Sequence, residues 1–312
     1  MKNLNKKETV FVIIGATATG KSSLAVELAK KVNGEIISAD SMQIYKGLDV
    51  GTAKVTKGEM QNIKHYMLDI KDITESYSVA EYKEECYNKI EEIIQKGNTP
   101  IIVGGTGLYI NAVVNNMVFA KEEKDIDNNK YDNISLEELI EILKNVDPES
   151  INTIDINNRK RVVRAIEMAE KGILKSNMTS KNDLWNANES PYDFFVIYID
   201  ISRDILYDRI EKRIDLMDKD VLINEAKLVY DIRDLSVGPV QAIGYKEFFG
   251  YFENTKTLEQ CIELLKINSR HYAKRQITWF KKLNKDIITN GIDTKEKQVE
   301  EILKKYNERR KR

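Results

Sequence analysis

Short apolar runs alternate with longer amphipathic stretches along most of the chain. The amphipathic stretches repeat their apolar residues at helical spacing, most clearly at 78–95 and 258–283. The apolar runs have the length of buried strands, and they lie at residues 10–14, 35–38, 65–70, 100–103 and 192–199. This alternation predicts an α/β fold in which helices flank a parallel sheet.

The alternation is interrupted in the middle of the chain. Residues 119–135 are rich in Lys, Glu, Asp and Asn, and residues 176–190 are polar and without period. Helical patterns lie between these two segments. We therefore expect a core made of residues 1–118 and 191–312, with a helical insertion at 119–190.

The composition narrows the class of protein. The chain has 312 residues, of which 42% are hydrophobic and 32% charged, as in soluble globular proteins. Its two cysteines, Cys86 and Cys261, lie far apart without metal-type spacing, which predicts reduced thiols in a cytoplasmic protein. No run of about 18 apolar residues occurs, and the N-terminus leads straight into the first strand. We expect neither membrane insertion nor secretion.

One motif near the N-terminus carries a specific chemistry. Residues 15–22, GATATGKS, fit the phosphate-loop (P-loop) pattern and lie between an expected strand and an expected helix. The glycines let backbone N–H groups point inward, where the positive end of the helix dipole adds to their field. We expect a diphosphate or triphosphate here, held by Gly15, Ala16, Thr17, Ala18, Thr19, Gly20, Lys21 and Ser22, with the Ser22 hydroxyl on Mg²⁺.

Asp40 follows the second apolar run, at the sheet edge where ligands bind in open α/β folds. Two roles are open for it, as a cap of the following turn or as a general base facing the phosphate site. Residues 41–54 after it have no helical or strand period. Such a segment beside a nucleotide-type site is more typical of a binding loop than of a linker.

The strand expected at residues 100–103 opens into Gly104-Gly105-Thr106-Gly107. Many ATP-hydrolysing P-loop enzymes place an Asp here, to hold Mg²⁺ and to organise water. The glycines would let a substrate approach the backbone closely. A tight strand-to-helix turn is the alternative, and it would explain the glycines but not Thr106.

Three arginines, Arg203, Arg209 and Arg213, follow the last apolar run, and the last two lie one helical turn apart. Arginines in this place often close over transferring phosphates, because their planar forks suit pairs of oxygen atoms. Surface ion pairs with neighbouring aspartates explain the spacing equally well.

Two helical stretches carry basic clusters, although the net charge of the chain is only −1. Residues 266–285 hold seven Lys or Arg and no Asp or Glu, with aromatic residues among them. The other cluster, at 159–164, lies at the start of a helix, where cations are unfavourable unless an anion compensates. Basic and aromatic residues along a helix suit a nucleic-acid backbone, and a solvated face is the alternative.

Five stretches taken together resemble one family, the tRNA dimethylallyltransferases or tRNA isopentenyltransferases. They are GATATGKS, DSMQIYKGLDVGTAK, GGTGLYI, RKRVVRAIE and the pair QAIGYKE with HYAKRQITWFKK. Their order and spacing extend from residue 10 to about 285. The first stretch is shared by many enzymes, whereas the second and the last pair are specific to this family.

The resemblance implies a fold similar to that of nucleotide kinases, with a helical insertion that grips the anticodon stem-loop of tRNA. It implies transfer of a dimethylallyl group from dimethylallyl diphosphate to N6 of adenine-37, giving N6-(dimethylallyl)adenosine and diphosphate. The adenine would be flipped into a channel, as in other base-modifying enzymes. Mg²⁺ is the expected cofactor, and we expect a monomer.

Carried onto this chain, the resemblance makes Asp40 the group that accepts the proton of the adenine amine. Thr106 would lie in the channel between donor and base, and Arg213 would contact the leaving diphosphate. P-loop residues 17–22 would hold that diphosphate, and Ser22 the Mg²⁺. The residues expected to contact tRNA are Asp40, Ser41, Met42, Gln43, Thr106, Lys160, Arg161, Val162, Val163, Arg164, Lys274 and Arg275.

The chain also departs from the family pattern. Ala16 stands where a Pro is common, Ser22 where a Thr is more usual, and Asn158 where an Asp is common. The short, Asn-rich segment 121–133 offers no clear position for the basic residue that the family uses near its substrate.

Two other functions stay open from the residues alone, a small-molecule kinase of the adenylate-kinase type and a non-catalytic P-loop RNA-binding protein. A kinase would not need the acid-free basic stretch 266–285. A binding module would not need Asp40 beside Lys21.

Overall fold

The computed structural model describes residues 7–119, 130–172, 174, 176, 188–235 and 237–311. Most of the Asn-rich segment 121–133, namely residues 121–129, therefore lies outside the described residues. Within the described part, parallel strands form one six-stranded sheet in the order β3-β2-β4-β1-β5-β6. The expected parallel α/β sheet is confirmed.

The strands form where the apolar runs predict them, with two exceptions. The expected strand at 65–70 is only two residues long, because Met67 and Asp69 take left-handed backbone conformations with φ of 62° and 54°. One short edge strand, β6, had no sequence prediction. The strands are β1 (Thr9–Ile14), β2 (Gly34–Ser38), β3 (His65–Tyr66), β4 (Thr99–Gly104), β5 (Asp193–Asp200) and β6 (Ile287–Asn290).

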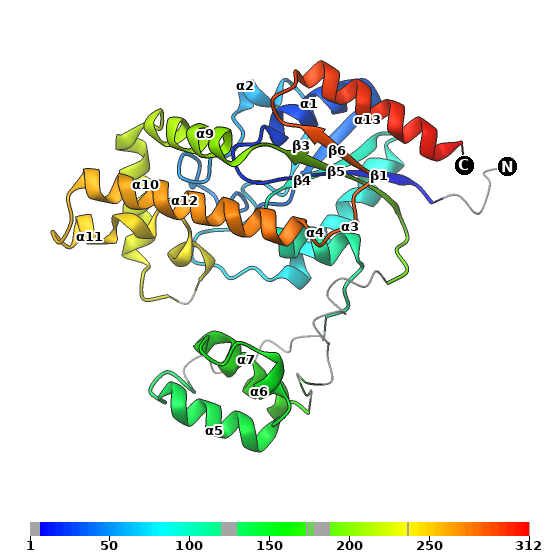
Figure 1. Cartoon of the computed structure of the whole chain (residues 1–312). Coiled ribbons are helices and arrows are strands. Elements are labelled where there is room, and N and C mark those ends of the chain that lie inside the picture. The colour runs from blue at the N-terminus through cyan, green and yellow to red at the C-terminus, as the bar shows by residue number, and fades with distance from the viewer. Residues whose placement is uncertain are drawn as a thin grey trace. The chain divides into compact units, whose positions relative to one another are not determined.

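Helices cover both faces of the sheet (Figure 1). Helices α1 and α13 pack on one face, where Leu28 and Ile302 join Phe11 and Phe195 in one apolar cluster. Helices α3, α4 and α12 cover the other face. The helices are α1 (Lys21–Val32), α2 (Lys57–Met60), α3 (Val79–Gln95), α4 (Gly107–Val114), α12 (Leu258–Phe280) and α13 (Lys295–Arg310).

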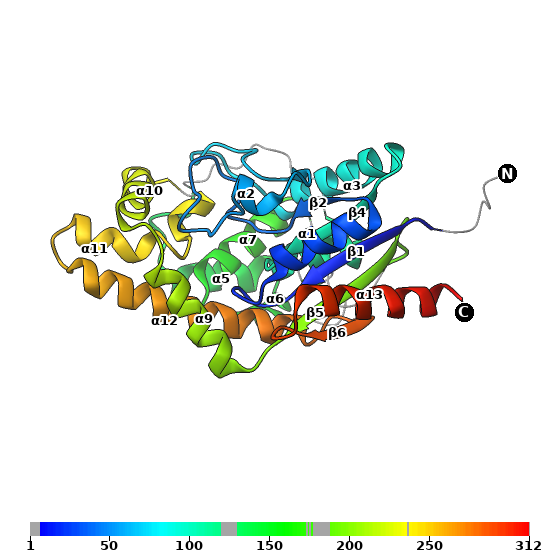
Figure 2. The ribbon, with the colours of Figure 1, turned by 90° about the horizontal axis from the view of Figure 1, so that it is seen from above.

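A second apolar cluster lies beyond the carboxyl ends of the strands. Tyr45 and Leu48 of the irregular segment 41–54 pack there against Ile214, Tyr245 and other buried side chains. Figure 2 shows α9–α12 gathered at this end of the core. The elements that complete it are α9 (Arg203–Asp215), α10 (Lys219–Asp231), α11 (Phe249–Phe252) and the 3₁₀ helices η1 (Gly238–Gln241) and η2 (Lys246–Phe248).

The chain divides into two compact units, Met1–Val114 with Ser190–Arg312, and Asn115–Glu189. The second unit has its own core, in which Leu139, Leu143, Val162 and Ile166 are fully buried. Its helices are α5 (Leu136–Val146), α6 (Ser150–Thr153) and α7 (Arg159–Glu170). No helix of the described residues combines the length and the apolar character needed to cross a bilayer.

Candidate active site

The candidate site lies where three parallel strands end. The P-loop follows β1, Asp40 follows β2, and Gly105 and Thr106 follow β4, which lies between the other two strands. Because the carboxyl ends of parallel neighbours meet at one edge of the sheet, these segments come together although they are far apart in the chain.

The P-loop adopts a tight wrap. Ala18 and Gly20 have left-handed backbones, with φ of 61° and 86°. The Thr19 hydroxyl donates to the Ala16 carbonyl at 2.8 Å, and Lys21 Nζ donates to the same oxygen at 2.6 Å. Gly15, Ala16 and Thr19 are buried behind the loop, so its open side is formed by Thr17, Ala18, Gly20, Lys21 and Ser22.

The Lys21 ammonium is only weakly stabilised in its protonated form in this setting. Its pKa is lowered to about 8, mainly because the ammonium is buried; the nearby Asp40 carboxyl opposes this fall, and Arg213 adds to it. An anion that binds beside Lys21 will stabilise the protonated form, because it replaces lost hydration with an opposite charge.

Asp40 takes the first of the two roles that its sequence position left open, as the cap of the following turn, and it also faces the phosphate site. Its Oδ1 accepts a hydrogen bond from the Met42 N–H at 3.0 Å, so the carboxylate caps the following turn. Burial raises its pKa, and the Met42 N–H, Lys21, Gln43 and Arg213 oppose that rise. A carboxyl with a raised pKa, close to two cations, is a competent proton acceptor.

Of the two alternatives that the sequence left open for the arginines, the structure favours the phosphate side for Arg213, because this residue of α9 lies at the P-loop. Its Nη1 donates to the Thr17 hydroxyl at 3.0 Å. Its buried Nε has no hydrogen-bond partner in the described structure, which leaves one donor for an anion. Burial lowers the pKa of Arg213, and Asp40 opposes that shift. Arg209 points elsewhere, because its Nη1 donates to the Gly291 carbonyl at 3.2 Å.

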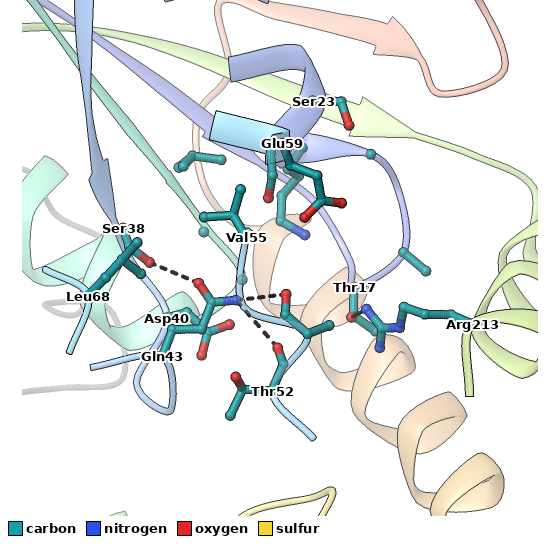
Figure 3. A pocket seen from close by; sticks show the side chains of 18 of the residues that line it. Thr17, Ser23, Ser38, Asp40, Gln43, Thr52, Val55, Glu59, Leu68 and Arg213 are labelled. Atoms are coloured by element: carbon teal, nitrogen blue, oxygen red, sulfur yellow. Dashed lines mark hydrogen bonds between the residues drawn. The ribbon is translucent and has the colours of Figure 1, made fainter. Parts of the chain in front are cut away.

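Two cavities share lining residues at this place, and Figure 3 shows the phosphate-side one. The phosphate-side cavity, of about 240 Å³, contains the open side of the P-loop together with Gln43, Glu59, His65 and Leu68. The helix-side cavity, of about 310 Å³, is bounded by Met42, Met217, Ile243, Leu265 and Arg275. The residues that line both are Thr17, Asp40, Thr52, Arg213 and Tyr272.

Thr106 contacts two residues that line the cavities, Ser41 and Tyr272. Its Oγ1 accepts from the Ser41 N–H at 2.9 Å, and it is not among the residues that line either cavity. Thr106 therefore links the β4 exit to the segment that follows Asp40.

The glycines at the end of β4 and after it are needed for protein packing, and Gly104 and Gly105 also line the phosphate-side cavity. A Cβ at Gly104 would lie 2.1 Å from the Ala39 carbonyl oxygen, and one at Gly105 would lie 2.3 Å from Gln276 Nε2. A Cβ at Gly107 would lie 2.4 Å from the Trp279 ring. The β2 exit and α12 occupy the space that the missing side chains leave.

Sequence reasoning missed Gln276 and Tyr272 of α12. The Gln276 side chain accepts from the Thr17 N–H at 2.8 Å and donates to the Gly105 carbonyl at 2.9 Å. Burial raises the pKa of Tyr272, and hydrogen bonds with Thr106 and Gln276 oppose the rise. Both residues lie in the stretch HYAKRQITWFKK, where the basic residues give a charge pattern but a single amide or tyrosine gives no pattern of its own.

The basic stretch 266–285 contains no acidic residue of its own, but acidic residues of another helix lie beside it in the folded chain. Helix α9 supplies partners, because Asp215 lies 2.8 Å from Lys266 and Glu211 pairs with Arg270. Lys274 and Arg275 are exposed and have no acidic partner among the described residues. Arg275 also stacks over the Tyr272 ring, 5.7 Å from its centroid, at the wall of the helix-side cavity.

In the second unit, the basic cluster begins helix α7. Lys160 and Arg161 are exposed, and Arg164 lies 3.6 Å from Glu167. Val162 is fully buried in the core of the unit, so the prediction that its side chain contacts tRNA directly is wrong. Val163 packs against the same core and stays partly exposed.

The donor set for a metal is sparse but suitable for Mg²⁺. No group of three or more His, Cys, Asp or Glu side chains among the described residues could hold a metal ion. Ser22 is exposed on the phosphate-side cavity. Mg²⁺ usually keeps several waters and is held by one or two protein groups together with substrate phosphates, so one hydroxyl beside a P-loop fits this ion.

Comparisons with known proteins agree on one family. A sequence model described as IPP transferase matches residues 43–283. The chain is 46% identical to a tRNA dimethylallyltransferase of Bacillus cereus (strain B4264), over 96% of this chain and 94% of the relative. It is also 46% identical to a tRNA dimethylallyltransferase of Bacillus anthracis, over 96% of this chain and 95% of the relative.

Solved structures of the same kind superpose on the chain. The tRNA delta(2)-isopentenylpyrophosphate transferase of Staphylococcus epidermidis matches with a TM-score of 0.71 and 40% identity, covering 97% of this chain and 100% of that chain. A eukaryotic dimethylallyltransferase acting on tRNA matches with a TM-score of 0.75 and 30% identity, covering 92% of this chain and 74% of that chain.

Proposed function

The chain belongs to the IPP transferase family, and from this premise we propose that it prenylates adenine-37 of tRNA. The donor is dimethylallyl diphosphate, and the products are N6-(dimethylallyl)adenosine in the anticodon loop and diphosphate. The observation that carries this proposal is the shared wall of the two cavities, where Asp40 interacts electrostatically with Lys21 and Arg213.

The phosphate-side cavity suits the donor. Lys21, the unpartnered Nε of Arg213 and the N–H groups of the P-loop can bind the diphosphate oxygens. As the bond between C1 and the diphosphate oxygen breaks, negative charge develops on the leaving group. Fixed cations beside that oxygen stabilise the transition state more than the ground state.

Mg²⁺ fits the same end of the site. Ser22 would hold the ion together with the diphosphate, and the ion would add positive charge at the leaving group.

The helix-side cavity suits the acceptor base. Met42, Ile243 and Leu265 offer apolar surface to a purine ring, and Arg275 and Lys246 lie at its wall for the tRNA backbone. The exocyclic amine is not reachable inside a stacked loop, so we propose that adenine-37 is flipped into this cavity.

Asp40 is the proposed general base. The amine nitrogen attacks C1 of the dimethylallyl group, and its proton passes to the Asp40 carboxylate as the diphosphate departs. The raised pKa of Asp40 favours this transfer, because it brings the base closer to the working pH. Thr106 holds Ser41, the residue next to Asp40, so we propose a positioning role for it.

We further propose that residues 119–190 form the insertion that contacts the anticodon stem-loop, through Lys160, Arg161 and Arg164. A monomer acting in the cytoplasm on free tRNA completes the proposal. The two cysteines of the chain are buried free thiols, as in proteins of reducing compartments.

The test is a transfer assay with radiolabelled dimethylallyl diphosphate and an anticodon stem-loop that carries adenine at position 37. We expect label in the RNA and release of diphosphate, and no label when guanine replaces that adenine. Phosphoryl transfer from ATP to a nucleoside monophosphate without prenylation would make the protein a kinase. RNA binding without either reaction would make it a binding protein.

A further inference from the structure

The Glu225 carboxylate holds a loop, residues 49–51, that leads into the wall of the two cavities. Glu225 of α10 is only 5% exposed. Its Oε1 accepts from the N–H groups of Asp49 and Val50, at 3.0 and 2.9 Å. Its Oε2 accepts from the Gly51 N–H at 3.0 Å and from the Tyr245 hydroxyl at 2.9 Å.

This arrangement is a backbone anion site that the protein fills with its own side chain. Three consecutive N–H groups converge on one carboxylate, in the manner in which backbone nests bind anions. No cation pairs with Glu225 in the described structure, so N–H and O–H dipoles alone compensate its charge. Burial raises the pKa of Tyr245, and Glu225 raises it further, so this hydroxyl stays protonated and donates.

Residues 49–51 and Tyr245 pack so closely that no additional atom fits between them. A Cβ at Gly51 would lie 2.4 Å from the Tyr245 ring, and one at Gly244 would lie 2.7 Å from the Gly51 carbonyl oxygen. At the other end of the loop, the buried Lys54 Nζ donates to the Tyr45 carbonyl at 2.8 Å and lies 2.6 Å from Asp49 Oδ1. The loop is therefore fixed by two buried side chains of opposite charge.

The part of the loop that Glu225 fixes leads directly into the site. Gly51 lines the helix-side cavity, Thr52 lines both cavities, and Ala53 lines the phosphate-side cavity. The Thr52 and Ala53 carbonyls face Gln43 Nε2 at 3.4 Å (Figure 3). A shift of residues 49–51 would thus change the wall around Asp40.

We propose that Glu225 is a positioning residue for prenyl transfer, holding residues 49–51 so that Thr52 and Gln43 shape the junction of the two cavities. This inference rests on the proposed function. Glu225 touches neither cavity, so it acts through the loop and not on the substrates.

The experiment compares Glu225→Gln with Tyr245→Phe and with Asp231→Asn. The first replaces an acceptor oxygen by an NH₂ group that faces the Gly51 N–H, while the second removes one donor and leaves the three N–H bonds. Asp231 is an exposed acid on the same helix that pairs with Lys227, so its variant loses the same charge without touching the loop.

For Glu225→Gln we expect kcat at saturating donor and stem-loop to fall about 10- to 100-fold, with KM for the donor changed less than about threefold. Tyr245→Phe should lower kcat less than Glu225→Gln does, and Asp231→Asn should have the kcat of the native enzyme. A Glu225→Gln variant with native kcat overturns the proposal. So does a loss of kcat that only matches a loss of folded protein in a thermal melt.

Amide hydrogen exchange separates this inference from the proposed function. If the native protein transfers no prenyl group, the proposed function fails. The positioning role is then still tested by the exchange of the Asp49, Val50 and Gly51 amides, which should be faster in Glu225→Gln. Unchanged exchange at these amides would overturn the positioning role itself.

Discussion

The Thr17 backbone N–H donates to Gln276 Oε1 at 2.8 Å, which joins the P-loop to a helix 259 positions further along the chain. The Nε2 atom of the same Gln276 side chain donates to the Gly105 carbonyl at 2.9 Å. Thr17 in turn accepts from Arg213 through its hydroxyl. One neutral side chain therefore sets the distance between the P-loop and the turn after β4.

Replacing Gln276 with Met should disturb the site more than the fold. Met has a similar size, but it leaves a buried N–H and a buried carbonyl without partners, at a cost of about 1–3 kcal/mol. We expect a several-fold rise in KM for the donor, because Thr17 lies in the P-loop. Urea unfolding and steady-state kinetics measure the two effects. The control is Gln95→Met, whose amide contacts only Glu91 on a helix surface and should change neither.

Donor binding should weaken as the pH rises through about 8, the pKa of Lys21 in the free protein. Below this pH the ammonium is charged and attracts the diphosphate, and above it the charge is lost. The loss of affinity should approach about tenfold per pH unit, as for one required proton. Isothermal titration calorimetry with dimethylallyl diphosphate, from about pH 6.5 to about pH 10, covers both sides of this pKa and measures the effect.

Lys21→Arg is the control for this titration, since a guanidinium stays charged throughout that range. Its donor affinity should be lower overall but independent of pH. A native protein whose affinity stays constant above pH 8 would contradict the assignment of Lys21 to the diphosphate.

Gly104→Ala should be strongly destabilising. The new Cβ would lie 2.1 Å from the Ala39 carbonyl oxygen, and this neighbour is backbone that cannot rotate away. We expect a loss of about 3 kcal/mol in the free energy of unfolding. Gly58→Ala is the matched control, because the nearest atom to its Cβ would be 4.0 Å away. Chemical denaturation of both variants gives the comparison, and equal stability would contradict the packing explanation.

Local sequence patterns were sufficient for most of the fold and for the charged part of the site. The P-loop, Asp40 and Arg213 each stand at a strand end or on the helix that follows one, so position along the chain indicates position at the sheet edge. The strand predicted at 65–70 failed at Met67 and Asp69, because left-handed backbones leave little trace in a hydrophobic pattern.

The residues that sequence reasoning missed act on partners far along the chain. Gln276 meets Thr17 and Glu225 meets Asp49 only after folding, and neither stands in a pattern of its own. A neutral amide or a single acid on an amphipathic helix has the same local signature whether it faces solvent or a buried loop. Only the structure distinguishes the two cases.

Arg161→Ala should weaken tRNA binding in a salt-dependent way. Arg161 is exposed at the start of α7, where a cation opposes the helix dipole, so its removal should not destabilise the helix. If it contacts a phosphate, the slope of log affinity against log salt should fall by about 1. Filter binding between low and moderate salt measures the slope. Lys144→Ala on α5 is the control, since Lys144 pairs with Glu141, and an unchanged slope in both would remove Arg161 from the interface.

Asp40→Asn should separate catalysis from binding. The amide oxygen can still accept from the Met42 N–H, so the turn is kept, but the side chain can no longer take a proton. We expect transfer from a preformed complex to slow by about 10²- to 10⁴-fold. Donor affinity should be equal or higher, because a negative charge beside Lys21 and Arg213 is removed. Single-turnover quench experiments give the rate, and equilibrium titration gives the affinity.

The control for Asp40 is Asp72→Asn, which removes an exposed carboxylate that pairs with Lys46 at 3.2 Å. It should behave as the native enzyme in both measurements. Native single-turnover rates in Asp40→Asn would show that another group takes the amine proton. In that case Asp40 would keep only its role at the turn, because its carboxylate contacts the backbone of Met42 in the ligand-free protein.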